Sequence, residues 1–279
     1  MLYKCLKYDL KCGLFNEYPK YLIAILIFLM VGFDFFIKTQ NYGTTILDYY
    51  FYLFLGMEEY IPAPGNKFQF PALWVTIMLY ISYTTLYYPF KDLNGYGKNI
   101  LLATQNKKIW YLSKCMWVVI STTIYFILAF IVLFFFAIIS GSKLIANVSS
   151  NTIFRFIPMI VVDENLFCEN AIYYKISFLH FVLPVFICIM NNLLQLFLSL
   201  FIKPFSSFIF TVSYTIACTY YLRGFMLDNY AMIGRSNALI ENGVDFVFGL
   251  TISLIISVIV VISGVLLFSK QDILNKDGA

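Results

Sequence analysis

Six long apolar runs constrain the fold of this chain more than any other feature of its sequence. Each run is about 17–26 residues long, the length that an α-helix needs to cross the roughly 30 Å hydrocarbon core of a bilayer. They lie at 21–37, 71–90, 115–139, 177–202, 205–222 and 246–268. Because 61% of the 279 residues are hydrophobic, little length is left for a water-soluble catalytic domain. We therefore expect an all-α polytopic membrane protein with six transmembrane helices in a single transmembrane domain, 1–279, whose first span is retained and not cleaved as a signal peptide.

The distribution of lysine and arginine predicts the orientation of these spans. The segments on one side carry 12 cations in 57 residues, whereas those on the other side carry seven in 93. The first set is 1–20, 91–114, 203–204 and 269–279, and the second is 38–70, 140–176 and 223–245. Because basic residues remain on the cytoplasmic side of short loops, we expect both termini in the cytoplasm of a cell. The net charge of +4 then indicates contact with anionic membrane lipid and not with nucleic acid.

The N-terminal residues 1–14 have the pattern of a short amphipathic helix. Its three lysines fall on one side and its leucines on the other, so we expect it to lie in the inner membrane interface. The lysines are Lys4, Lys7 and Lys11, and the leucines are Leu2, Leu6 and Leu10. Gly13 is expected to end this helix. Two apolar stretches in the outer connections, 46–57 and 153–162, are too short to span and predict interfacial or re-entrant segments.

The sequence carries few groups that could perform chemistry. Gly97-Lys98 resembles part of a phosphate-binding loop, but Asn99 follows where Ser or Thr is required, so that motif is absent. His180 is the single histidine, and the spans contain no metal-binding HExxH pattern or paired carboxylates. Asp34 is the one carboxylate within a predicted span, near enough to its outer end to reach water. We expect no catalytic, cofactor or metal site in this chain and no enzyme activity.

Two polar stripes occur within the fourth and fifth predicted spans. Asn191 and Gln195 are four residues apart and share a helix face, and Thr211, Thr215 and Thr219 form a similar stripe. One interpretation is that these side chains make hydrogen bonds between neighbouring helices, each contributing ~0.6 kcal/mol. The other is that they line a cargo path. The pattern alone leaves both open.

The cytoplasmic segment 91–114 and the C-terminal tail resemble those of a known transporter family. The segment contains a glycine, a short helix-forming stretch with a Leu-Leu-x-Thr turn, two lysines and a Ser-Lys pair before the third span. These residues are Gly95, Asn99, Ile100, Leu101, Leu102, Thr104, Lys107, Lys108, Ser113 and Lys114. The tail, 267–273, has an aromatic residue, a lysine and an Asp followed by an aliphatic residue. Together with the topology, these motifs resemble the type-2 (ABC-2-like) exporter permeases of ATP-binding-cassette transporters.

The resemblance implies a function. Residues 91–114 would form a coupling loop that docks into a separate ATPase subunit through Asn99, Ile100, Leu101, Leu102, Thr104, Lys107 and Lys108, with Leu101 and Leu102 exposed in the isolated permease. ATP and Mg would bind to that partner. A second permease copy, identical or related, would complete a dimer in a bacterial cell membrane. The apolar outer connections favour an amphipathic cargo such as a hydrophobic peptide or bacteriocin.

Two alternatives come from other classes of protein. The chain can be an ATP-independent membrane immunity or scaffold protein that binds its target through the outer connections. It can also be a polytopic enzyme, which the shortage of polar groups within the spans disfavours.

Overall fold

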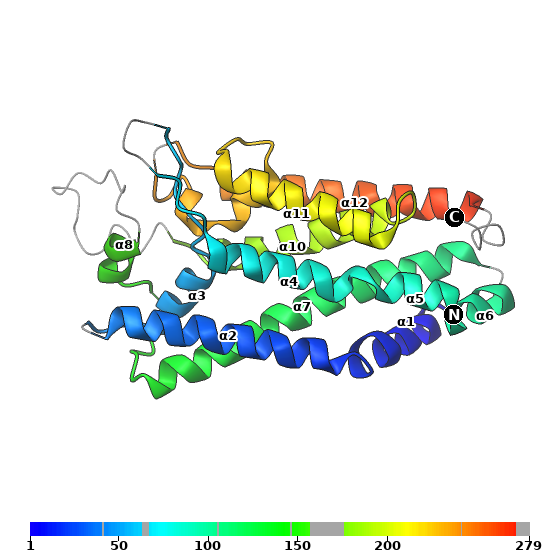
Figure 1. Ribbon diagram of the computed structural model, residues 1–279, viewed down its shortest axis with the longest axis horizontal. Helices are drawn as coiled ribbons and strands as arrows, with labels where there is room; N and C mark the ends of the chain where they lie inside the picture. Colours follow the sequence, from blue (N-terminus) through cyan, green and yellow to red (C-terminus); the bar gives the residue numbers. More distant parts are fainter. Residues whose placement is uncertain are drawn as a thin grey trace.

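A computed structural model describes residues 1–40, 42–62, 67–104, 106–145, 147–156, 176–240 and 242–271. Its regular elements are helices that lie roughly side by side in an elongated bundle (Figure 1). The longer ones are α2 (Tyr18–Thr39), α4 (Ala72–Leu86), α7 (Lys107–Ile139), α10 (Leu179–Leu198), α11 (Pro204–Tyr220) and α12 (Phe246–Lys270). The shorter ones are α1 (Leu2–Leu10), α3 (Ile46–Phe54), α5 (Tyr88–Asn94), α6 (Tyr96–Thr104), α8 (Ser150–Phe156) and the 3-10 turns η3 (Leu227–Ala231) and η4 (Ile233–Arg235).

Four of the six predicted spans correspond to helices long and apolar enough to cross a membrane. These are α2, α7, α10 and α12. The second and fifth predicted spans correspond to α4 and α11, which have 15 and 17 residues and reach only about 22 and 26 Å at 1.5 Å per residue. Tyr87 separates α4 from α5, and Pro89 stands in the first turn of α5, where its missing N–H is tolerated. Six full spans therefore remain a prediction.

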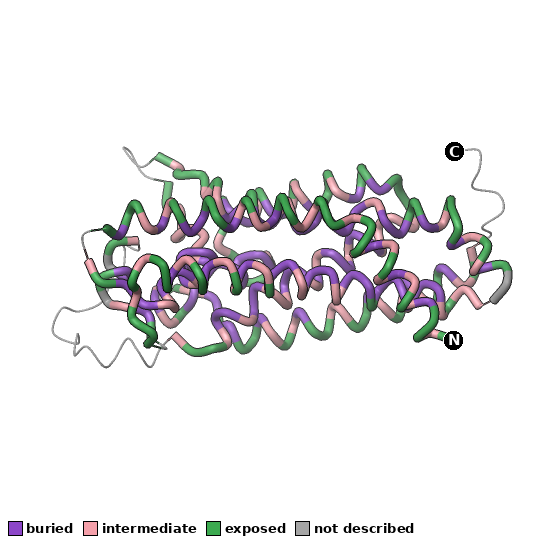
Figure 2. Tube along the Cα trace, turned by 90° about the horizontal axis from the view of Figure 1, so that it is seen from below, coloured by how far each residue is buried: buried purple, intermediate pink, exposed green. Residues whose placement is uncertain are grey.

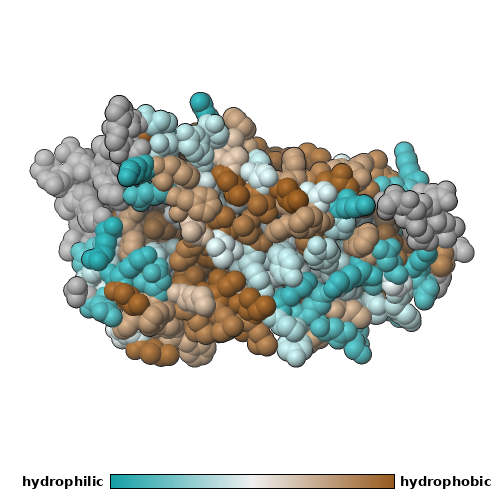
Figure 3. Space-filling view, viewed as in Figure 1, coloured by the Kyte–Doolittle hydropathy of each residue, from teal (hydrophilic) through white to brown (hydrophobic). Residues whose placement is uncertain are grey.

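The central helix of the bundle is α10, which packs against α12, α7, α4 and α11. In the most apolar 18-residue stretch of α10, 56% of the residues are buried, whereas in that of α12 only 17% are. Helix α12 therefore presents most of its side chains outward. Buried positions follow the inside of the bundle in Figure 2. Hydrophobic side chains dominate the middle of the face seen in Figure 3, and hydrophilic ones gather toward its two ends. This distribution is compatible with a protein that crosses a bilayer.

The two ends of the bundle carry different elements. One end, called here the α6 end, holds α5, α6, the N-terminus and the C-terminal end of α12; the other, the α3 end, holds α3 and α8 (Figure 1). The predicted re-entrant segment 46–57 includes the buried helix α3. Asp48 stabilises this end because its carboxylate accepts hydrogen bonds from the N–H of Thr45 (2.8 Å) and of Ser149 (2.7 Å), at the starts of α3 and α8. The second such segment, 153–162, is described only as far as residue 156.

The N-terminal helix differs from the sequence prediction in two respects. Gly13 does not end it, because the chain continues through a π-helical turn, Lys11–Phe15. Gly13 is buried there, and a Cβ at this position would approach Trp117 Nε1 to 2.4 Å. The buried side of α1 is formed by Cys5 and Asp9 and not by the leucine row, because α1 packs along α7 and Asp9 reaches a buried lysine of that helix.

Candidate functional site

The α6 end brings together the residues that the sequence singles out in segment 91–114. Helix α5 ends at Asn94, α6 covers most of the predicted helical turn, and Asn106 starts α7 by accepting a hydrogen bond from the N–H of Ile109 at 3.1 Å. Lys107 to Lys114, predicted as the end of a loop, are instead the first two turns of the 33-residue helix α7. The segment is therefore a short helix held between two others at the tip of the bundle (Figure 1).

Helix α6 has a packed face and a free face. Gly97 is buried against α5, where a Cβ would lie 2.0 Å from Asp92 Oδ2, and Leu101 is only 5% exposed within an apolar cluster with Trp110. On the other face Tyr96 and Leu102 are 63% and 56% exposed. The prediction that both leucines are exposed is therefore wrong for Leu101, which is four residues from Gly97 and so shares its face.

The remaining predicted coupling residues lie in α6 itself and at the start of α7. Asn99 is exposed and Ile100 is half-buried. Thr104 is in the last turn of α6, and the structure does not describe its side chain. Lys107 donates a hydrogen bond to the carbonyl of Gln271 at 2.6 Å, which connects the start of α7 to the end of α12, whereas Lys108 is exposed.

A buried ionic cluster lies next to α6. Lys114 is 1% exposed, and its Nζ contacts Asp9 Oδ1 and Asp92 Oδ2. Asp9 also accepts hydrogen bonds from Ser113 and from the Tyr88 hydroxyl, the latter at 2.9 Å. The Tyr88 hydroxyl is therefore a donor to this carboxylate. We call these five residues the Lys114 cluster; it joins α1, α5 and α7.

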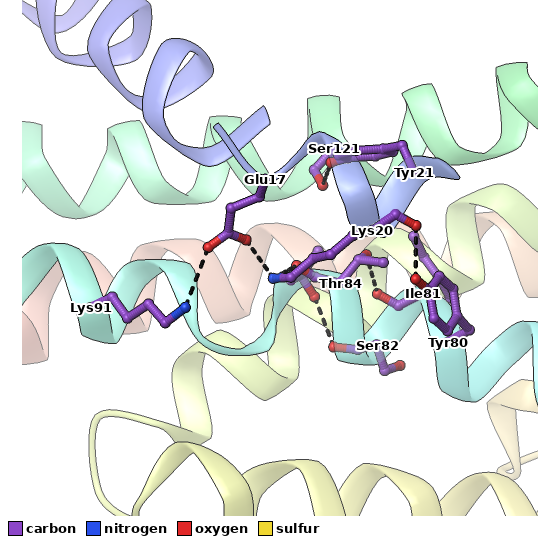
Figure 4. Close-up of polar contacts among 10 residues, drawn as sticks. Glu17, Lys20, Tyr21, Tyr80, Ile81, Ser82, Thr84, Lys91 and Ser121 are labelled. Carbon is purple, nitrogen blue, oxygen red and sulfur yellow. Dashed lines mark hydrogen bonds and ion pairs between the residues drawn. The ribbon is translucent and has the colours of Figure 1, made fainter. Parts of the chain in front are cut away.

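A second polar group connects the α6 end to the start of α2. Glu17 bridges Lys20 and Lys91, the latter at 3.7 Å (Figure 4). Lys20 also donates to the carbonyl of Thr84 at 3.2 Å, and its own carbonyl accepts from Tyr80 at 2.7 Å. These contacts join α2, α4 and α5.

The predicted cargo-path residues form a mostly buried seam inside this one chain. Asn191 donates to Asp228 Oδ1 at 2.6 Å. Gln195 donates to the carbonyl of Ser82 at 3.0 Å and accepts from Thr211 at 3.1 Å, which joins α10 to α4 and α11. Three hydrogen bonds between elements thus engage Asn191, Gln195 and Thr211.

The other two threonines of the stripe are buried on the same helix. Thr215 faces the carboxylate of Asp228, whereas Thr219 donates to the carbonyl of Ile216 within its own helix. The hydroxyl of Thr219 therefore makes its hydrogen bond within α11 and not to another element.

Two buried charged residues in the connection between α11 and α12 were not found by sequence reasoning. Asp228 is 2% exposed, its Oδ2 has no hydrogen-bond partner among the described residues, and burial raises its pKa. Arg235 is fully buried, and its guanidinium donates to carbonyls that include those of Cys218 and Thr219 in the last turn of α11. Burial lowers the pKa of Arg235 to about 10, so it remains charged. Gly224, Gly234 and Gly243 in this connection indicate turns, but they do not reveal that it folds inward.

The polar groups predicted elsewhere are engaged locally. Asp34 forms an ion pair with Lys38 at 2.8 Å and accepts a hydrogen bond from Tyr52, with both charged side chains partly exposed as the sequence suggested. His180 lies on Phe246 and has its Nε2 2.9 Å from the Ser236 hydroxyl. These contacts place His180 where α10 packs against the connection between α11 and α12.

Comparisons of the chain with models of protein families, with curated proteins and with solved structures give no match.

Proposed function

We propose that this chain is the membrane-spanning permease subunit of an ATP-binding-cassette exporter, and that α6 is the helix on which a separate ATPase subunit docks. The observation that carries the proposal is the two-sided character of α6. One face is fixed to the bundle by Gly97 and Leu101, while Tyr96, Asn99 and Leu102 are exposed on a helix with an adjoining exposed cation, Lys108. An exposed aromatic and an exposed leucine at the tip of a bundle are suited to burial against a partner.

The contacts behind α6 supply a way to transmit force. The Lys114 cluster ties the segment that carries α6 to α1 and α7, and Glu17 ties α5 to α2. Closure of the ATPase against α6 would therefore move α7 and α2 together with it. Buried ion pairs suit this role because their geometry is specific even where their net stabilisation is small.

The assembly and cargo follow as parts of the same proposal. Many symmetric oligomers place a shared path on their two-fold axis, and the outward apolar side chains of α2 and α12 offer surface for a second permease copy or for lipid. The cargo is an amphipathic molecule, such as a hydrophobic peptide or bacteriocin. In this assignment ATP and Mg bind to the partner subunit, and the chain itself is not an enzyme.

Copurification tests the assignment. The tagged chain, purified in mild detergent from its native membrane, should retain an ATP-binding-cassette ATPase and hydrolyse ATP. Leu102→Asp should abolish both, since burying a leucine contributes roughly 1.5–3 kcal/mol that an aspartate cannot provide. Tyr3→Asp is the matched control, because Tyr3 is 74% exposed on α1 at the same end of the bundle. Absence of an ATPase from the wild-type preparation would instead favour the immunity or scaffold alternative.

A further inference from the structure

A cavity of about 620 Å³ lies at the α6 end. Its walls come from α5, Lys98 of α6, the first turns of α7, the end of α10, the turn between α10 and α11, the start of α11, and the end of α12. The volume falls within the range of about 300–1,000 Å³ that is typical of ligand sites. Neither the coupling role of α6 nor the polar seam of α10 accounts for this cavity.

The walls of the cavity are largely aromatic and partly fixed. Trp110 and Phe268 stack with ring centroids 5.1 Å apart, which holds the side formed by α7 and α12. Phe201 and Phe205, on the other side, remain exposed at the rim. These rings offer a path for a hydrocarbon chain between the cavity and the apolar sides of the bundle.

The charged side chains among the described residues that line the cavity are all cationic. Lys91, Lys98 and Lys203 line it, and no aspartate or glutamate is among its described lining residues. Lys91 also lies 3.7 Å from Glu17, so its ammonium group is already held at the rim. Helix α11 begins at Pro204 beside Lys203, and its first turn has no side-chain cap among the described residues. The positive end of its dipole adds to the same field.

The cavity also lies at a defined level of the bundle. The ends of α10 and α12 that form it are the ends of two helices long enough to cross a bilayer. The lysine distribution predicts this end as cytoplasmic, where the leaflet carries anionic lipid. An apolar wall beside three cations at the headgroup level matches an amphiphile with a negatively charged head.

We propose that this cavity binds an anionic phospholipid from the inner leaflet, with its phosphate at Lys91, Lys98 and Lys203 and the upper part of an acyl chain along the aromatic wall. The site can be tested separately from the proposed exporter function because it requires no ATPase, and Lys98 is its one contribution from α6 among the described lining residues. It would fix a lipid where α5, α10 and α12 meet.

Binding of phosphatidylglycerol to the purified full-length chain, measured by native mass spectrometry with phosphatidylcholine of the same acyl chains as competitor, tests this site. The chain should prefer phosphatidylglycerol. Changing Lys91, Lys98 and Lys203 together to Gln should weaken that binding about a hundredfold, from roughly fivefold per cation near an anionic headgroup. The matched control changes Lys4, Lys7 and Lys11 to Gln, which removes the same charge from the exposed side of α1 and should leave binding unchanged.

Two further measurements distinguish lipid binding inside the cavity from binding to a charged surface. Ser199→Phe fills the cavity without changing its charge, so it should also weaken phosphatidylglycerol binding. Millimolar inorganic phosphate should not displace the lipid, since phosphate lacks the acyl chain. Equal affinity for the two lipids, equal losses in the two lysine triples, wild-type binding by Ser199→Phe, or displacement by phosphate alone would each overturn the proposal. Monodisperse elution of every variant confirms that it is folded.

Discussion

Replacing Lys114 with methionine removes the ammonium group that contacts both Asp9 and Asp92 in the interior of the α6 end. Methionine keeps most of the apolar stem and adds no charge, so the change is mainly electrostatic. Two buried carboxylates then lose their cation. Removing one partner of a buried ion pair costs about 3–5 kcal/mol, and we expect a loss of stability in that range.

The alternative substitution Asp9→Asn gives a smaller expected loss. It leaves the contact between Lys114 and Asp92 in place and preserves a polar side chain for the donors Ser113 and Tyr88. The cost is then that of weakened hydrogen bonds, about 1–3 kcal/mol. The order of the two variants follows from the contacts alone and does not depend on the absolute values.

A cysteine on α1 reports the effect locally. Cys5 lies one turn before Asp9 on the buried side of α1, and burial raises the pKa of its thiol, so it should react slowly with maleimide in the wild-type chain. The measurement uses a background with Cys12→Ser and Cys168→Ser. If α1 detaches more often, the labelling rate rises by about tenfold for each 1.4 kcal/mol of lost local stability. Lys114→Met should therefore accelerate labelling a hundredfold or more.

The control for this assay is Lys7→Met, which alters an exposed lysine of the same helix and should leave the labelling rate unchanged. Thermal unfolding of the same proteins in detergent gives an independent measure. An unchanged rate of Cys5 labelling in Lys114→Met, with a loss of less than about 1 kcal/mol, would show that the cluster does not hold α1 against α7.

Three further predictions concern single buried positions. Burial raises the pKa of Asp228, so wild-type stability should fall as pH rises from the ordinary carboxyl range toward the raised value, and Asp228→Asn should gain thermal stability relative to wild type over that range, by at most ~1.4 kcal/mol per pH unit; a difference between the two proteins that stays the same at every pH would contradict this. Gly97→Ala should lower the free energy of unfolding by about 1–3 kcal/mol, because its Cβ meets the carboxylate of Asp92. Gly43→Ala, whose Cβ would have open space around it, should change this free energy little, and similar losses in both variants would contradict the prediction. Arg235→Met should lose on the order of 3 kcal/mol in the same assay because buried carbonyls lose their donor, and a neutral effect would refute that role.

The long helices could be predicted because their signal is hydrophobic length. Helices α2, α7, α10 and α12 follow the first, third, fourth and sixth apolar runs. The ends were less predictable. Lys107 to Lys114 suggested a loop because they contain three lysines, but Lys114 finds two carboxylates that are distant in sequence, which lets α7 begin two turns earlier. A single sequence does not show such pairing.

The sequence predicted which segment forms the candidate site, but not which of its side chains are exposed. The helix-forming stretch before Lys107 is a helix, but nine residues contain too few apolar positions to decide which leucine faces inward. Packing in the apolar cluster with Trp110, on the helix face that it shares with buried Gly97, makes that choice for Leu101. Asp228 was missed because it lies in a connection between two predicted spans, and its burial depends on the way that connection folds against α10.

Photo-crosslinking from position 102 in intact cells tests the central claim most directly. A benzoylphenylalanine in place of Leu102 should give a covalent adduct with an ATP-binding-cassette ATPase, because Leu102 is on the free face of α6. The same group in place of Tyr3, exposed on α1 at the same end of the bundle, should not. Normal expression of the Leu102 variant with no ATPase adduct, or labelling of a cysteine at position 102 by an impermeant thiol reagent from outside the cell, would contradict the assignment of α6 as the coupling helix.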